Sequence, residues 1–588
     1  MRKITVFFCP LLMLALLFFA ACRDNQLKRY FDVSINPETD SIYRVKPMPS
    51  WTPTAFDGQG RLFYLCKTWG FATYYRNGTE CKNHIDSLLF KCLDKLQSHP
   101  DMDKVTFNGF LSDMLLPVCV DTVEYDSLEF DMKDYSLITN DWMTDTVYLD
   151  KEVRHLLANV FNDYRGFCYE ARNSSIGQVR RPKKTQYDDI QNVSVRLFGL
   201  FDYWNFINYF NPNKNFMDGN WDSVLYVSIP DFVSANDEIS YRKAIYRLAN
   251  HLCDTHASLP ATVDTLLFGS YRPDFTMKMI DDTLIVSSIR DEENNADGFR
   301  IGDVVLQVDG MDARYLYDSL QQYVCGSNYW SNQRLVCNAV LSRQEKTTQF
   351  TILRDKDTLL IESHNETSMG LYEKNMNLLK MKEKEQLWKW IDEDVAYLDM
   401  ASLTHRNFKK NYSAISRAAA IILDLRNYPE DYVVLDIARD FVPEKSYFAY
   451  IVYPDVHWPG KLRYGLSSNL IGSKDCYKGK LIVLVDENTQ SYSEYLTMML
   501  QANPNTVVVG SPSSGADGNV DSFVFPRDVV TIFTSLGVVY PDLSPTQRTG
   551  IHIDYQVEPT LSSIREKRDV ILEKGIEIAC LYAPINPR

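Results

Sequence analysis

Four short apolar segments in the last third of the chain constrain its fold more than any other feature. Each ends in polar or turn residues, and they read VAYLDM (395–400), AAIILDLRN (419–427), KLIVLVDEN (480–488) and NTVVVGSP (505–512). The segments between them are long enough for crossover helices, notably 493–501, so the pattern predicts an α/β sheet. Functional groups of such sheets gather at the carboxyl ends of the strands. We therefore look for a site in DLRNYPED (424–431) and DENTQSYSE (486–494).

The chain of 588 residues is too long for a single hydrophobic core, and a prior of about 150 residues per domain predicts several domains. The chain contains an internal repeat, in which RLFYLCKTWGFATYY (61–75) resembles RLFGLFDYWNFINYF (196–210). The spacing of the apolar residues predicts an amphipathic helix in each copy. Their Trp and Tyr stripes are expected to be core rather than a ligand site.

The segment GFRIGDVVLQVDGMDA (298–313) resembles the central signature of a PDZ domain, which closes on a tight turn at Asp309-Gly310.

These patterns together predict an α+β multidomain protein with a helical N-terminal region, a PDZ-like β module and an α/β core. The expected boundaries are 1–22 for a signal peptide, 23–50 for a tether, 51–190 for an N-terminal domain with the helical repeat unit, 191–264 for a helical bundle ending in DTHAS, 265–368 for the PDZ-like domain and 372–588 for the core.

The N-terminus predicts export. Met1, Arg2 and Lys3 precede an apolar run that ends in FFAAC at Cys22, and this ending resembles the cleavage box of bacterial lipoproteins. Plain cleavage or an uncleaved anchor is the alternative. We therefore expect an exported lipoprotein of the bacterial cell envelope. A lipid on Cys22 is expected to hold it at the outer membrane.

Charge and cysteine spacing exclude two classes of partner. The net charge of -15 and the pI near 5.2 argue against a nucleic-acid partner, because phosphate binding needs a basic surface. The twelve cysteines contain no CxxC pair and no His/Cys cluster with zinc spacing. We expect no metal and no cofactor.

The serines of DENTQSYSE allow two interpretations. Ser491 stands just before a predicted helix, and Glu494 three residues later completes a capping-box pattern, so Ser491 can be an ordinary N-cap. A serine at a strand-to-helix junction also lies among backbone N–H groups at the positive end of a helix, the setting that an acyl-enzyme needs. Taken alone, the stretch favours the cap.

Five motifs in one order resemble peptidase family S41, the C-terminal processing and tricorn-type serine proteases. They are DTHA (254–257), RIGDVVLQVDG (300–310), IILDLRN (421–427), NTQSYSEYL (488–496) with VVVGSPSSGADG (507–518), and TQRTGIHIDYQVEPT (546–560). The resemblance runs from Leu197 to Ile576. It implies a protease core of the ClpP/crotonase type and a peptide or unfolded protein as substrate.

By position, the resemblance implies that Ser491 is the nucleophile and that Ser493 and Glu494 belong to the following helix. Processing proteases carry a lysine base where this chain has Ala516, so the residue type excludes a serine/lysine dyad. The tricorn-like branch uses a histidine base, and His256 matches its motif. Thr255 and Gln547 match the positions that orient this histidine, but a glutamine cannot offset an imidazolium charge.

The oxyanion loop departs from the family pattern. Family members often read D-L-R-x-N-x-G-G, and the DLRNYPED stretch lacks the glycine pair whose backbone donates to the oxyanion. The resemblance then implies the N–H of Tyr492 as one donor and Tyr428 or Glu430 as the other. Two hypotheses follow: a cell-envelope serine peptidase, or a catalytically inactive scaffold that binds peptides, glycans or apolar ligands.

Overall fold

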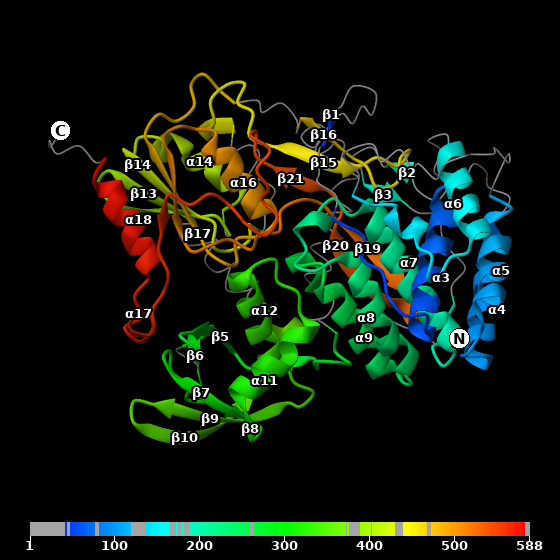
Figure 1. The fold of residues 1–588 in the computed structure, drawn as a ribbon. Coiled ribbons are helices and arrows are strands. Elements are labelled where there is room, and N and C mark those ends of the chain that lie inside the picture. The colour runs from blue at the N-terminus through cyan, green and yellow to red at the C-terminus, as the bar shows by residue number, and fades with distance from the viewer. Residues whose placement is uncertain are drawn as a thin grey trace, which may run out of the picture.

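The computed structural model describes residues 41–43, 48–76, 82–118, 137–164, 172–173, 178–180, 187–258, 264–292, 295, 297–371, 373–374, 388–401, 403–429, 439–466 and 472–582. The expected signal peptide, the lipidation position Cys22 and the oxyanion candidate Glu430 lie outside these residues. Figure 1 shows a helical region, a smaller β-rich unit and an α/β region that contains the C-terminal helix α18 (Val570–Cys580). Within the described ranges, no helix has the length and apolar character needed to cross a membrane.

Helices dominate the N-terminal region. Those that the structure describes are α3 (Gly58–Tyr74), α4 (Lys82–Ser98), α5 (Lys104–Leu115), α6 (Lys151–Asp163), α7 (Val193–Phe210), α8 (Trp221–Ser234) and α9 (Glu238–Asn250). The two copies of the internal repeat form α3 and α7. Trp69 on α3 and Trp204 on α7 are buried, as predicted for core residues. The prediction that these helices are amphipathic is wrong, because α3 and α7 are buried on nearly every side.

A hairpin from the α/β region covers part of α7, whereas α3 packs against other helices. Its strands β19 (Val520–Phe525) and β20 (Val529–Thr534) pair antiparallel, and Figure 1 shows them beside α7. Tyr203 of α7 packs against Phe523 with ring centroids 5.0 Å apart. The hairpin and the helices therefore share one hydrophobic core, and the end of β20 lies next to the segment that follows α9.

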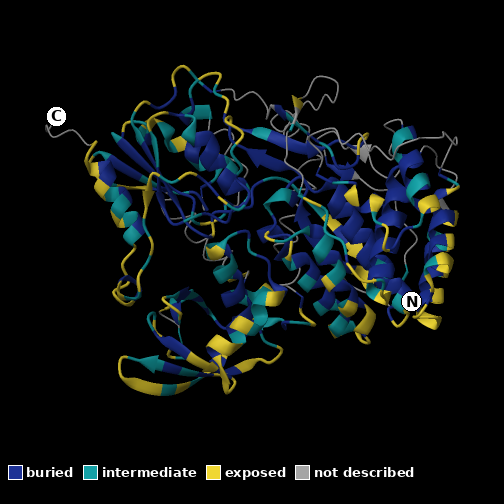
Figure 2. Cartoon of the chain, viewed as in Figure 1, coloured by how far each residue is buried: buried dark blue, intermediate teal, exposed yellow. Residues whose placement is uncertain are grey.

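The smaller unit contains a sheet of strand order β10-β9-β7-β6-β5. Its elements are β5 (Phe275–Ile280), β6 (Thr283–Ile289), β7 (Val304–Val308), β8 (Met311–Asp312), α11 (Ala313–Leu320), α12 (Tyr329–Leu341), β9 (Thr347–Arg354) and β10 (Asp357–His364). Asp309 and Gly310 turn β7 into β8 with φ values of 51° and 76°, which confirms the predicted tight turn. Figure 2 shows much of β10 exposed, whereas α12 packs against β5. Its assignment as a PDZ-like module stays a prediction.

The α/β region is built on a sheet of order β12-β13-β14-β17-β18-β22. The strands are β12 (Trp388–Asp392), β13 (Val395–Asp399), β14 (Ala420–Asp424), β17 (Lys480–Val485), β18 (Thr506–Gly510) and β22 (Tyr555–Gln556), all parallel except β12. α18 covers one face, and α14 (His405–Ile415) with α16 (Tyr492–Gln501) covers the other. Burial on both faces explains why the four predicted segments are almost wholly apolar. The expected α+β multidomain class is confirmed.

Candidate active site

Ser491 occupies a sharp turn between β17 and α16. Its backbone has φ 55° and ψ -116°, a combination that residues with a Cβ rarely adopt. Strain of this kind costs about 1–3 kcal/mol and persists only where surrounding contacts hold it. The turn places Ser491 at the N-terminal end of α16 and at the carboxyl end of a central parallel strand.

The carboxylate of Glu494 holds this turn in place. One oxygen accepts hydrogen bonds from the backbone N–H groups of Ser491 (3.0 Å) and Ala516 (3.1 Å), and the other accepts from the N–H of Gly515 (2.8 Å) and the hydroxyl of Ser513 (2.7 Å). Glu494 is fully buried. The predicted role of Glu494 in the helix that supports Ser491 therefore extends to a second segment, 513–516.

Ala516 lies beside Ser491, because the Ser491 N–H also donates to the Ala516 carbonyl over 3.1 Å. Ala516 is fully buried. The chain thus places a methyl group at the position where the processing proteases are expected to carry their lysine base, and a base for Ser491 has to come from another segment.

Segment 513–516 connects the serine turn to the histidine motif. The Thr255 hydroxyl donates to the Ser514 carbonyl (3.2 Å), and the Ser514 N–H donates to the Thr489 carbonyl (2.9 Å). His256 follows Thr255 in the short 3-10 helix η3 (Thr255–Ser258) and is buried. Two motifs that are far apart in the sequence are therefore joined by hydrogen bonds through segment 513–516.

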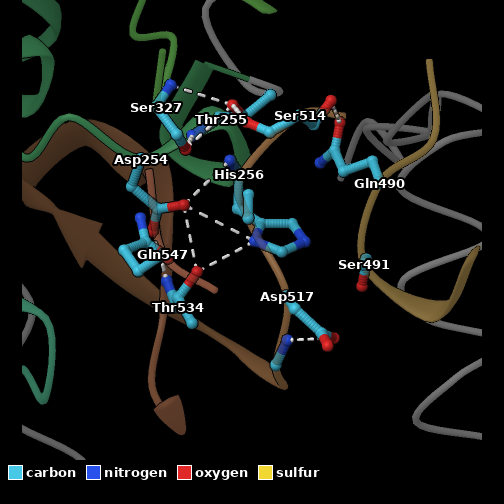
Figure 3. A network of polar contacts seen from close by, with 12 residues as sticks. Asp254, Thr255, His256, Ser327, Gln490, Ser491, Ser514, Asp517, Thr534 and Gln547 are labelled. Atoms are coloured by element: carbon cyan, nitrogen blue, oxygen red, sulfur yellow. Dashed lines mark hydrogen bonds and ion pairs between the residues drawn. The ribbon is translucent and has the colours of Figure 1, made fainter. Parts of the chain in front are cut away.

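The imidazole of His256 has two side-chain partners, both on its Nδ1 atom. Nδ1 lies 2.9 Å from the hydroxyl oxygen of Thr534, at the end of β20, and 3.5 Å from a carboxylate oxygen of Asp254. Figure 3 shows the ring between this pair and the turn that carries Ser491. Among the described residues, no hydrogen bond joins His256 to Ser491. Catalytic hydrogen bonds are often long before substrate binds, so this separation leaves His256 as the base candidate.

The structure corrects the predicted partners of His256. Gln547 donates to the Cys253 carbonyl (3.3 Å) and accepts from Asn213 (3.1 Å), while the Thr255 hydroxyl bonds to Ser327, Ser331 and Ser514. Neither side chain bonds to the imidazole. Positions carried over from a family motif fix the main chain, but the hydrogen bonds depend on which side chains pack there.

Sequence reasoning missed two residues, Asp254 and Thr534. Asp254 stands in the quoted DTHAS motif, and an aspartate two residues before a histidine can bond to its backbone, as the 3.1 Å contact from the His256 N–H to Asp254 shows. That spacing was a usable signal. Thr534 is the last residue of the apolar strand β20 and has no motif around it, so no local pattern marks it.

Two of the predicted oxyanion donors, Tyr492 and Tyr428, lie beyond the carboxyl ends of neighbouring parallel strands. Tyr492 is the first residue of α16, so its N–H belongs to the first helical turn, where backbone donors have no carbonyl within the helix. Tyr428 follows the carboxyl end of β14, the parallel neighbour of β17. Both assignments stay predictions.

Charged side chains of the β-rich unit contact the loop before Ser491. Lys278 on β5 forms an ion pair with Glu487 at 2.6 Å, and Arg334 on α12 donates to Gln490 at 2.8 Å. Burial and the neighbouring Glu487 raise the pKa of Asp486 to about 7. The loop that leads to Ser491 thus depends on the docking of the β-rich unit and on a carboxyl group that titrates near neutral pH.

We expect Asp486 to make stability depend on pH. An acid whose pKa is raised keeps its proton in the folded chain, so the stability it provides at low pH is lost as the pH rises through about 7. Between pH 6 and pH 8 this loss should be roughly 1 kcal/mol, and Asp486→Asn should remove it. Urea unfolding at both pH values measures it, with the 87% exposed Asp282, as Asp282→Asn, for control. An equal loss in Asp486→Asn would contradict the assignment.

Within the described residues, no group of three or more His, Cys, Asp or Glu side chains could hold a metal ion.

The fold and the site define an α/β core with a strained serine at a strand-to-helix turn and a buried histidine near it. Residues 394–557, most of the α/β region, match the model of peptidase family S41.

Several solved structures are similar to this chain at low sequence identity. Mature CPAF complexed with lactacystin is 12% identical, with a TM-score of 0.50 over 66% of this chain and 98% of that chain. A putative peptidase from Parabacteroides merdae is 12% identical, with a TM-score of 0.39 over 67% and 97%. The photosystem II D1 C-terminal processing protease is 14% identical, with a TM-score of 0.37 over 62% and 93%. No curated protein sequence matches the chain.

Proposed function

We propose that the protein is a serine peptidase that uses Ser491 as nucleophile and His256 as general base. The observation that carries the proposal is the backbone of Ser491, which is held at φ 55° and ψ -116° in a turn clamped by a buried carboxylate. An ordinary N-cap has an extended, unstrained backbone, so a cap alone gives no reason for this conformation. The match to the model of a peptidase family supports the same conclusion.

In the proposed reaction, Ser491 Oγ attacks the carbonyl carbon of a peptide bond while Nε2 of His256 takes the hydroxyl proton. The N–H of Tyr492 donates to the oxyanion that forms. The tetrahedral intermediate then collapses, His256 returns the proton to the leaving amine, and a water molecule hydrolyses the acyl-enzyme by the same route. An unfolded or extended peptide is the substrate class that the family match favours.

A serine-reactive fluorophosphonate tests the nucleophile directly. We expect stoichiometric labelling of the folded chain on the peptide that contains Ser491, detected by mass spectrometry, and no labelling after Ser491→Ala. Ser493→Ala is the matched control, because the Ser493 hydroxyl is buried two residues away and has no hydrogen-bond partner among the residues that the structure describes. Absence of labelling in the folded wild-type chain would contradict the proposal and favour the inactive scaffold.

We also propose that the peptidase works in the bacterial cell envelope, anchored through a lipid on Cys22. The support is the N-terminal sequence, in which basic residues, an apolar run and FFAAC follow one another. Mass spectrometry of the N-terminal fragment from membranes, in the wild-type chain and in Cys22→Ala, tests the anchor.

A further inference from the structure

The ring of His256 is held by Asp254 and Thr534, two residues to which the family resemblance assigned no role. We propose that Asp254, with the hydroxyl of Thr534 as a bridge, is the carboxylate that positions His256 for catalysis. This inference rests on the proposed function, because it assigns a role within the same site. Both residues are positioning residues, since they act on the substrate only through the imidazole.

Asp254 is buried and fixed by four contacts. One oxygen accepts from the His256 N–H (3.1 Å) and from the Thr534 hydroxyl (3.0 Å), and it also lies 3.5 Å from Nδ1 of His256. The other oxygen accepts from the Thr534 N–H (2.6 Å). Figure 3 shows Asp254, Thr534 and the imidazole as one connected group. The carboxylate therefore cannot rotate away from the ring without losing backbone hydrogen bonds.

The direction of these hydrogen bonds determines which ring nitrogen carries the proton. A carboxylate can only accept, so the single hydroxyl proton of Thr534 points to Asp254. The hydroxyl oxygen then has only lone pairs to offer to Nδ1, 2.9 Å away, so Nδ1 has to be the donor. Nε2 is left with its lone pair, which is the state that a general base for Ser491 requires.

Asp254 also supplies the negative charge that Gln547 lacks. Burial pushes the pKa of Asp254 up, but the hydrogen bond and charge of His256, together with the bonds from Thr534, outweigh it and lower the pKa below its ordinary value. The carboxylate is thus ionised at neutral pH. Its charge stabilises the imidazolium that forms when His256 accepts the serine proton.

The arrangement depends on the hairpin described above. Thr534 ends β20, and the contacts of this strand with η3 place the hydroxyl between Asp254 and the ring. Helices, hairpin and α/β core therefore each contribute to the histidine site, which a sequence motif at one position cannot encode.

Asp254→Asn is the decisive variant. In either orientation the Asn amide turns its NH₂ toward one backbone donor, the Thr534 N–H or the His256 N–H. The bond from the Thr534 N–H is the shorter one (2.6 Å against 3.1 Å), so we expect the amide oxygen to keep it and the NH₂ to face the Thr534 hydroxyl. The hydroxyl would then accept from Asn and donate to Nδ1, which moves the ring proton to Nε2. We expect kcat/KM for a peptide substrate to fall by about 10⁴-fold, as wrong-tautomer variants of serine proteases do.

The tautomer itself is read by ¹⁵N NMR of the imidazole, with the His256 signals assigned by their absence in His256→Gln. We expect a protonated Nδ1 in the wild-type chain and a protonated Nε2 in Asp254→Asn. Thr534→Val removes the bridge but leaves the 3.5 Å contact, so its loss of kcat/KM should be smaller than that of Asp254→Asn. Thr531→Val is the matched control, since Thr531 is buried on the same strand and its hydroxyl makes no hydrogen bond to His256 among the described residues.

The readouts separate the two levels of the proposal. If wild type hydrolyses peptides and Asp254→Asn keeps both its rate within threefold and its protonated Nδ1, the positioning role is wrong and the peptidase stands. If wild type is inactive, the proposed function fails, whereas the tautomer of the ring still tests the geometry. If Asp254→Asn does not fold by circular dichroism, Thr534→Val decides: an unchanged rate and tautomer would overturn the inference.

Discussion

Replacing His256 by alanine should lower kcat/KM for a peptide substrate by about 10⁴-fold or more, because serine is a weak nucleophile without a base. Ser491→Ala should give a loss of similar size. The double variant should be no worse than either single variant, because the two groups act in one step and their effects are not additive. A fluorogenic peptide assay on the purified chain measures all three.

His251→Ala is the control for this series. His251 caps the C-terminal end of α9, a few residues before the motif, and is not among the described polar partners of the His256 imidazole, which are Thr534 and Asp254. Its activity should stay close to that of the wild-type chain. Losses in the double variant that equal the product of the single losses would show that His256 and Ser491 act independently, and the dyad would have to be abandoned.

Glu494→Gln should have the largest effect on the geometry of the site. Four donors converge on the two carboxylate oxygens, and an amide replaces one oxygen by an NH₂ group that faces donors. Buried donors without an acceptor cost about 1–3 kcal/mol each, so we expect the free energy of unfolding to fall by roughly 2–4 kcal/mol. Since the strained Ser491 turn loses its clamp, activity and fluorophosphonate labelling should fall together.

Denaturant unfolding and labelling rate measure this prediction, and Glu577→Gln is the control. Glu577 is 62% exposed and pairs only with Lys574 in a surface contact, which is worth little. Full labelling at Ser491 in Glu494→Gln would show that the turn keeps its conformation without the carboxylate. The strain at Ser491 would then need another cause.

The sequence was informative where structure is local. The four apolar segments became β13, β14, β17 and β18 because strands buried on both faces have to be apolar along their whole length. Ser491 and Glu494 could be placed at the start of a helix because a capping pattern involves only neighbouring residues. The ordered motifs predicted a resemblance to peptidase family S41, and residues 394–557 match the model of that family.

The helical region shows where periodicity fails. The spacing of apolar residues in α3 and α7 predicts one buried face, yet both helices are buried nearly all round. The hairpin β19–β20 covers α7 from a position far along the chain. A hydrophobic pattern reports that a residue is buried, but it does not report which elements bury it.

The sequence by itself determined the strands, the serine turn and the residue types that could serve as nucleophile and base. Only the tertiary structure decided that Asp254 and Thr534, rather than Thr255 and Gln547, contact the imidazole, and that Glu494 joins Ser491 to segment 513–516. The physical reason is that the two kinds of feature depend on residues at different separations along the chain. Strand and cap patterns depend on residues within a few positions of one another, whereas a hydrogen bond acts over about 3 Å of space and takes its partner from whichever segment packing brings there.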